Sequence, residues 1–409
     1  MSNILENPAG SHDAFNILTG STGTSSDDLF VKANNRTYYA QGVQTALNFN
    51  FKTDNITHKI DVGFRYHQDE IDRFQWHDAY SMNEGVMQLT KSGTPGTESN
   101  RVTKANAFAS YVQYKLKYDK FTFTPGIRYE NIAFNAKKYG KNDPERNGTD
   151  LTETNNTVDV FSPGIGLDYQ FSNYLSTFAG VHKGFSPPGS NEGSKPEKSI
   201  NYEMGVRYAK KALSGQAVIF YTDYSNLLGS DLAAAGGQGT NALFNGGEVQ
   251  TKGLEFQLSY DLLSTHKQSA VSLPLSVVYT YTDAFFENSF DSEFGGWGTV
   301  TEGDQLPYLA NNQFTLILGL EHKKFAVNIS GKHMDEMRDR PGQGEIPADE
   351  KIDSYFVIDL SANYAMHKNI SLFANATNLT DEVYGVARRP AGLRPGMPAA
   401  FNIGLKAGF

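Results

Sequence analysis

Arginine side chains are the residues of this sequence best suited to bind an anion. A guanidinium group presents a planar fork of N–H donors, which can meet a carboxylate through two parallel hydrogen bonds. Six arginines and one histidine lie at the ends of alternating segments or in the connections between them: Arg73, His77, Arg101, Arg338, Arg340, Arg388 and Arg389. The chain has a formal net charge of −9, so a local basic site would draw anions against an acidic background. Alternatively, each arginine is solvated or pairs with a neighbouring carboxylate from Asp69, Asp72, Asp335 or Asp339.

A glycine-rich connection, LAAAGGQGTNALFNGG, supplies a second set of candidate ligand contacts. The side chains of Gln238, Asn241 and Asn245 end in amides, which can donate hydrogen bonds to the oxygen atoms of a ligand. The same composition is typical of a mobile surface loop. The sequence leaves both interpretations open, ligand contact and mobile lid.

Histidines lie beside acidic residues in three segments, RYHQDE, FQWHDAY and GKHMDEM. On an extended strand neighbouring side chains point to opposite faces, so His67 and Asp69 share a face but supply only two ligands. The motifs GxSxG, HExxH and GxxxxGK[ST] do not occur. We therefore predict no metal site, no cofactor and no enzyme activity.

The elements that must position these residues are β-strands. Apolar and polar or small residues alternate in about fifteen segments, which fall at 35–52, 57–74, 101–119, 120–136, 155–171, 173–185, 199–210, 213–229, 247–260, 269–286, 306–321, 324–338, 352–366, 369–384 and 399–409. Phe256 and Leu258, for example, flank Gln257. No apolar run approaches the ~18 residues of a membrane-spanning helix, and mean hydropathy is −0.46. A strand with one face toward lipid and the other toward a polar lumen gives such a pattern, which predicts an all-β, antiparallel transmembrane barrel.

Short and long connections alternate along the chain. The short ones lie at Lys52–Thr57, Tyr118–Phe121, Phe171–Asn173, Lys210–Leu213, Asp261–Ser269, Glu321–Lys324 and Met366–Asn369. Short periplasmic turns and longer extracellular loops are typical of outer-membrane barrels. We therefore expect the C-terminus in the periplasm and the arginines at the extracellular mouth.

Three blocks resemble one family. NLTDEVY with the basic loop and final strand that follow it resembles the C-terminus of TonB-dependent outer-membrane receptors. HKGFSPPGSNEGSKPEKSINYEMGVRY and EVQTKGLEFQLSYDL resemble two further blocks of these receptors, in the same order. Within the family, GFRYHQDEIDRFQ, the SPPGSN…KPEKS wording and RRPAGLRPGMP look most like ferric-citrate receptors.

The resemblance also implies a ligand, an energy source and further segments of the protein. It implies a receptor that takes up ferric citrate, an anionic chelate rich in carboxylate oxygens, with energy from a TonB–ExbB–ExbD complex that acts through an N-terminal plug. About fifteen strands would then be the C-terminal part of a roughly 22-stranded barrel. We expect residues 1–34 to be an extracellular loop remnant or a disordered start and residues 35–409 to be the barrel. We expect the plug, the TonB-contacting segment and the signal peptide to lie outside this fragment.

Two other function classes stay open. A passive porin-like barrel would have the same strands and turns but no plug, and a TonB-dependent receptor for another siderophore would differ in its loops. A soluble β-sheet protein is a third interpretation, which detergent dependence would separate from the others. The expected surroundings are outer-membrane lipid and lipopolysaccharide, and the acidic balance argues against nucleic-acid binding.

Overall fold

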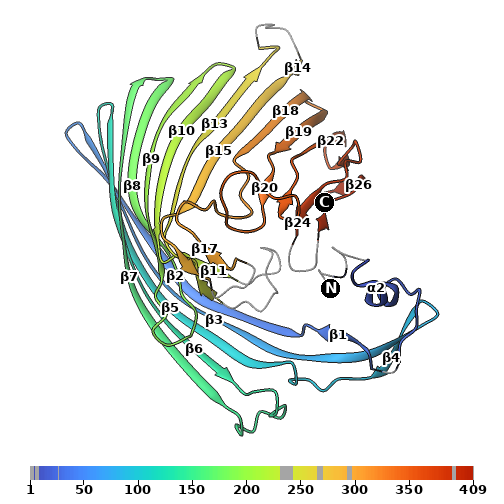
Figure 1. Ribbon diagram of the computed structural model, residues 1–409. Coiled ribbons are helices and arrows are strands. Elements are labelled where there is room, and N and C mark those ends of the chain that lie inside the picture. Colours follow the sequence, from blue (N-terminus) through green and yellow to red (C-terminus); the bar gives the residue numbers. More distant parts are fainter. Residues whose placement is uncertain are drawn as a thin grey trace. The chain divides into compact units, whose positions relative to one another are not determined.

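The protein is built almost entirely of antiparallel β-strands (Figure 1). The computed structural model describes residues 4, 9–25, 27–230, 243–264, 270–292, 297–388 and 393–408. A short helix, α2 (His12–Leu18), precedes the strands. Among the described residues, no helix has both the length and the apolar character to cross a membrane.

The longer strands carry the fold. They are β2 (Arg36–Thr53), β3 (Ile56–Asn83), β5 (Ser99–Tyr118), β6 (Phe121–Lys138), β7 (Thr152–Ser172), β8 (Leu175–Ser186), β9 (Glu197–Lys210), β10 (Leu213–Ser225), β13 (Val249–Asp261), β15 (Pro274–Phe286), β18 (Asn312–His322), β19 (Phe325–Met334), β22 (Tyr355–His367), β23 (Ile370–Thr377) and β26 (Ala400–Ala407). Shorter strands flank them or form hairpins in the connections: β1 (Leu29–Ala33), β4 (Val86–Lys91), β11 (Leu228–Ser230), β12 (Leu243–Asn245), β14 (Val271–Ser272), β16 (Phe290–Asp291), β17 (Thr299–Val300), β20 (Met337–Arg338), β21 (Lys351–Ile352), β24 (Gly385–Ala387) and β25 (Arg394–Pro395).

The chain divides into two compact units. Unit 1 comprises Met1–Lys115, Pro125–Pro163 and Phe185–Glu197, and unit 2 comprises Leu116–Thr124, Gly164–Gly184 and Lys198–Phe409.

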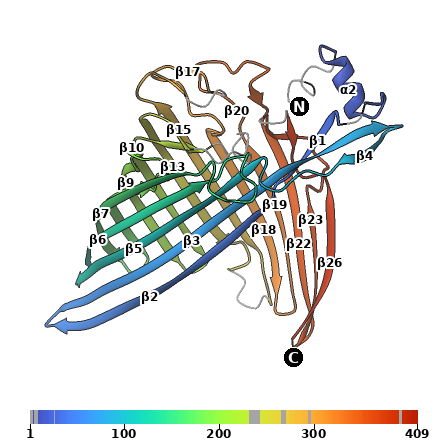
Figure 2. The same ribbon diagram turned by 90° about the horizontal axis from the view of Figure 1, so that it is seen from below.

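Strand β3 organises unit 1. Its 28 residues pair with β2 and then with β1 along one edge, and with β5 and then β4 along the other (Figure 2). The part of β3 after Arg73 pairs with β1 and β4, and most of its side chains on both faces are buried or partly buried, so the alternation fades. Ala79 and Met82 are buried there, on opposite faces. This explains why the sequence pattern ended at residue 74 while the strand runs nine residues farther.

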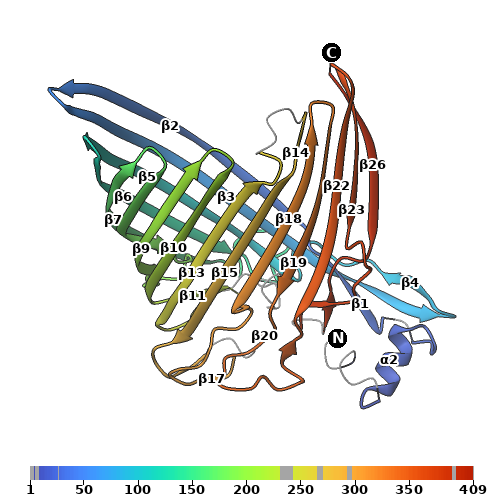
Figure 3. The same cartoon turned by 90° about the horizontal axis from the view of Figure 1, so that it is seen from above.

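Unit 2 is a continuous meander. From β9 each main strand pairs with the next in the order β9, β10, β13, β15, β18, β19, β22, β23 and β26, always antiparallel (Figure 3). The registers keep like faces together, because residues directly opposite each other share a face. Phe256, for example, lies between Ala217 and Tyr279.

One face of the strands is apolar and exposed. Phe108, Ile165, Leu167 and Leu258 are exposed, as the alternation predicted, whereas Phe256, expected on the same face, is only partly exposed. On the other face small residues make room for large neighbours: a Cβ at Gly63 would lie 2.0 Å from the Tyr111 ring. The all-β, antiparallel expectation is confirmed, and each of the fifteen expected segments overlaps a strand.

The short connections are tight turns. Asp54, Asp119 and Lys211 each begin a two-residue turn with φ of 50°, 48° and 55°. Aspartate tolerates this left-handed conformation better than most residues, which favours a turn at the first two positions. The opposite ends of the strands are joined by the longer connections, and we call these the long-loop ends.

Candidate functional site

The predicted site residues fall into both units. Arg73, His77 and Arg101 belong to unit 1, and Arg338, Arg340 and Arg388 belong to unit 2. Gln238, Asn241 and Arg389 lie outside the described residues. The two sets are therefore described separately.

Three arginines gather at the long-loop end of unit 1. Arg73 of β3 lies directly opposite Arg36 of β2, and both Arg36 and Arg101 are close enough to repel Arg73 electrostatically. Arg73 is only 4% exposed, and Arg101 is half-buried. Because several like charges lie close together, this cluster creates a concentrated positive potential at one end of the sheet. Burying these charges costs free energy.

A fourth arginine, Arg146, ties a long connection to this end of the sheet. Its guanidinium donates two hydrogen bonds to the Asp72 carboxylate, at 2.6 and 2.9 Å, and a third to the Asn100 side-chain oxygen at 2.8 Å. It also lies over the Phe74 ring at 4.5 Å and near the Tyr139 ring at 5.2 Å. The hydrogen bond to Asp72 raises the pKa of Arg146, against the opposing effect of burial. Arg146 was not among the candidate residues predicted from the sequence.

The connection that carries Arg146 is held in shape by Asp143. This buried carboxylate accepts backbone N–H bonds from Asn147, Gly148 and Thr149 at 2.8, 2.7 and 3.2 Å. The Asn100 side chain donates to the Asp143 backbone oxygen at 2.7 Å. The signal in the sequence was NDPERNGTD, in which an aspartate precedes a run of turn-forming residues.

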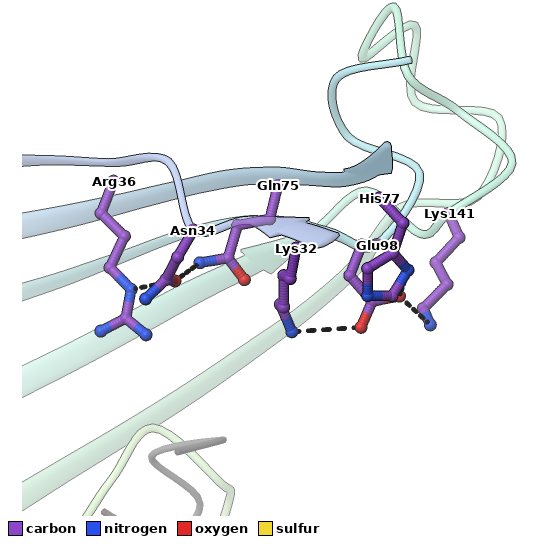
Figure 4. A network of polar contacts seen from close by, with 7 residues as sticks. All are labelled: Lys32, Asn34, Arg36, Gln75, His77, Glu98 and Lys141. Atoms are coloured by element: carbon purple, nitrogen blue, oxygen red, sulfur yellow. Dashed lines mark hydrogen bonds and ion pairs between the residues drawn. The ribbon is translucent and has the colours of Figure 1, made fainter. Parts of the chain in front are cut away.

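Glu98 is the centre of an ionic network (Figure 4). Lys32 Nζ lies 3.1 Å from one carboxylate oxygen, and Lys141 Nζ and His77 Nδ1 lie 3.2 and 3.4 Å from the other. Burial raises the pKa of Glu98, but the hydrogen bonds from Lys32 and Lys141 outweigh it and the pKa is lowered overall.

The network continues along the same face of the strands. The Gln75 side chain donates a hydrogen bond to Asn34, which also accepts one from Arg36 at 2.9 Å (Figure 4). Arg73, Gln75 and His77 alternate on β3 and so project from one face. The Arg73 cluster and the Glu98 network therefore lie on one face of the sheet, which we call the cationic face of unit 1. Arg73 and Gln75 are buried within it, whereas His77 is accessible.

The arginines of unit 2 have a different setting. Arg338, 2% exposed, donates hydrogen bonds to the Gln305 side chain at 3.1 Å and to the Gly344 carbonyl at 3.0 Å. Arg388 donates to the carbonyl oxygens of Lys351, at 2.6 Å, and Ala348, at 2.9 Å.

Arg340 is the most exposed of these three. Its Nε lies 4.0 Å from Asp339 and 3.8 Å from Glu350, and the side chain is 47% exposed. Arg340 thus lies beside the carboxylate of Asp339, as the alternative interpretation of the sequence had it, whereas Arg338 and Arg388 donate to loop oxygens.

The side chains gathered here are donors of the kind that bind anions. Within the part of the chain that the structure describes, no three histidine or acidic side chains gather as metal ligands do. The cationic face instead offers guanidinium and ammonium donors, which suit carboxylate or phosphate oxygens.

Comparison with known protein sequences supports the family resemblance over most of the chain. A family profile described as "TonB dependent receptor-like, beta-barrel" matches residues 7–379. The metal-pseudopaline receptor CntO of Pseudomonas aeruginosa is 23% identical over 354 residues, which are 81% of this chain and 46% of that protein. The ferrioxamine B receptor of Salmonella typhimurium is 22% identical over 293 residues, 68% of this chain and 37% of that protein. The chain spans about half the length, or less, of these curated relatives.

Solved structures share the fold. The ferric citrate transporter FecA in its unliganded form superposes with a TM-score of 0.70 at 19% identity, over 92% of this chain and 55% of that one. The closed form of the ferric-catecholate import receptor Fiu of E. coli K12 gives a TM-score of 0.69 at 18% identity, over the same shares of the two chains.

Proposed function

Since this chain belongs to the family of TonB-dependent receptor β-barrels, we propose that it is part of an outer-membrane receptor for a metal chelate. Ferric citrate, or a ferric chelate of similar negative charge, is the proposed ligand. The observation that carries this choice is the cationic face of unit 1, where Arg36, Arg73 and Arg101 gather in a chain of net charge −9.

The chemistry of binding follows from the donors. A ferric polycarboxylate presents carboxylate oxygens, which guanidinium groups bind through short charge-assisted hydrogen bonds. The positive potential steers the anion toward the face, and Arg146, already fixed by Asp72, keeps the neighbouring connection in place. The chain's own residues thus bind and orient the chelate, and we propose no enzymatic step.

The proposed orientation places the long-loop ends outside the cell and the two-residue turns and C-terminus in the periplasm. The exposed apolar face, with Phe108, Ile165 and Leu167, would contact outer-membrane lipid, below the lipopolysaccharide. TonB, with ExbB and ExbD, would supply the energy through the plug of the full-length receptor.

Single cysteines test this orientation, because the chain contains no native cysteine. Glu192 lies exposed in the connection between β8 and β9, and Lys368 lies exposed in the turn between β22 and β23. In the full-length protein on intact cells, an impermeant maleimide should label Glu192→Cys and leave Lys368→Cys unlabelled until the cells are opened. The reverse labelling pattern would refute the orientation.

Calorimetry tests the ligand. The purified full-length receptor should bind ferric citrate more tightly than a cationic siderophore chelate, and its affinity for ferric citrate should fall as salt rises. Preference for the cationic chelate would remove citrate but leave the receptor fold. Uptake of radioactive iron that is equal with and without TonB would instead favour a passive barrel.

The relatives suggest a second ligand class. CntO is a receptor for a metal–pseudopaline complex, and it matches 81% of this chain. Competition between ferric citrate and a metal–pseudopaline complex in the same calorimetric experiment separates the two ligand classes.

A further inference from the structure

The Glu98 network joins segments that are far apart in the sequence. Lys32 lies on β1, His77 on β3 and Lys141 in the connection after β6, while Glu98 itself lies just before β5. Two ammonium groups and an imidazole thus surround a single carboxylate. Among these four, the Lys141 side chain is 64% exposed and the Glu98 side chain only 22%.

We propose that Lys32, His77 and Lys141 form a carboxylate-binding subsite, which the protein's own Glu98 occupies until a carboxylate of an incoming ligand displaces it. The subsite would take one carboxylate of a polycarboxylate. The inference rests on the proposed function, because it assigns a further part of the same cationic face.

Glu98 can leave the subsite at little structural cost. Its backbone N–H donates to the Gln75 carbonyl at 2.9 Å, and the nearby Gly96 N–H donates to the same oxygen at 3.0 Å. These bonds hold the chain in place while the side chain rotates. The partners Lys32 and Lys141 are 44% and 64% exposed, so each ion pair is weak and exchangeable.

In the same unit, the Asp72 carboxylate belongs to an ion pair that is held more firmly than those of Glu98. It meets Arg146 through two hydrogen bonds, and the guanidinium lies over the Phe74 ring. To leave, Asp72 would break a bidentate pair and strand a partly buried cation. Glu98 has no such constraint, so a ligand can displace the Glu98 carboxylate more easily than that of Asp72.

The position of the subsite also suits a ligand that bridges it to the arginines. His77 shares a face of β3 with Arg73 and Gln75. Figure 4 shows two neighbouring groups of contacts, one joining Arg36, Asn34 and Gln75 and the other joining Lys32, Glu98 and Lys141. A ligand with several carboxylates can contact the arginines and the subsite together. A ligand with one carboxylate cannot, so the subsite would select for polycarboxylates.

The test uses two substitutions with opposite expected effects. Glu98→Gln removes the internal competitor but keeps the side chain's size, so binding of both ferric citrate and iron-free citrate should tighten about five- to tenfold. Lys141→Gln removes a donor and should weaken binding of both about three- to tenfold. Calorimetry on the full-length receptor measures both ligands against both variants.

A matched control is available on the opposite face of β3. Glu70 pairs with Lys104 at 2.8 Å, and its side chain is 29% exposed, close to that of Glu98. Glu70→Gln should leave both affinities unchanged, because the alternation of β3 directs Glu70 away from Arg73.

The outcomes separate the inference from the proposed function. If Glu98 only braces the loops, Glu98→Gln and Lys141→Gln will shift affinity in the same direction, or Glu98→Gln will have no effect, and the inference is wrong. If citrate binds more tightly to Glu98→Gln while no variant binds ferric citrate, the subsite is supported and the ferric citrate proposal fails. If neither ligand binds any variant, both fail.

Discussion

The arginines of unit 1 and those of unit 2 have the same chemistry in two different settings. In unit 1, Arg36, Arg73 and Arg101 repel one another at the end of neighbouring strands. In unit 2, Arg338 and Arg388 donate to loop carbonyls and amides. A guanidinium that already donates to the backbone holds a loop in place, whereas a group of cations at close range raises the local potential. The difference is one of setting: the unit 2 arginines donate to loop oxygens, whereas the unit 1 arginines lie close enough to repel one another.

The largest effect that we expect concerns stability in unit 2. Arg338→Ala removes two charge-assisted hydrogen bonds from a buried position and should lower the free energy of unfolding by about 3 kcal/mol. Urea unfolding of the full-length receptor in detergent measures this. The control is the half-exposed Arg340, whose replacement by Ala should cost about 0.5 kcal/mol or less. Equal losses of unfolding free energy at Arg338 and Arg340 would mean that Arg338 has no special structural role in unit 2.

The next effect concerns binding in unit 1. Arg73→Ala should weaken ferric citrate binding by about 1.5–3 kcal/mol, because the ligand loses a charge-assisted contact. Arg73→Lys should restore part of the affinity, since lysine keeps the charge but lacks the fork. Arg340→Ala serves as the comparison in the same calorimetric titration. A larger loss at Arg340 than at Arg73 would move the ligand site to unit 2.

A smaller effect concerns the connection that Arg146 holds. Arg146→Ala should lower the free energy of local opening at Asn147–Thr149 by about 1–2 kcal/mol, because the bonds to Asp72 and Asn100 are lost. Amide hydrogen exchange at these residues measures the opening. Lys104→Met, at an ordinary ion pair of the same unit, is the control. Unchanged exchange would mean that Asp143 alone fixes the connection.

The smallest effect is a pH dependence. The pKa of Glu98 is lowered in the folded protein, so its ion pairs contribute stability above the ordinary value of 4.5 and lose it as pH falls through the lowered pKa. The contribution should be below about 1 kcal/mol, because the partners are exposed. Unfolding curves of the wild type and Glu98→Gln should converge as pH falls below the lowered pKa of Glu98. A difference between them that grows toward low pH would contradict this sign.

Much of the fold could be predicted from the alternation of side chains. The strand pattern is strong wherever one face is apolar and the other polar, as around Phe256 and Gln257. It fails at the end of β3 beyond Arg73, where side chains on both faces are largely buried, and it missed β1, which has only five residues.

The site was harder to predict than the fold. Arginine positions at strand ends could be read from the sequence, but which of them cluster depends on register, which places Arg36 opposite Arg73. Glu98 and Arg146 lie in long connections, whose path no periodic pattern specifies. Their partners Lys32 and Asp72 are 66 and 74 residues away in the sequence.

The length of β3 has a mechanical consequence. At about 3.3 Å per residue, its 28 residues reach roughly 90 Å, or about 65 Å along the membrane normal at a ~45° tilt. The apolar band of an outer-membrane barrel is only about 25 Å tall. In the proposed orientation, the hydrogen-bonded strands around β3 would therefore extend tens of ångströms beyond the lipid as one rigid projection. In that orientation, antibodies and other large particles that approach the cell would meet the hairpin of β3 and β4 before any other part of this strand.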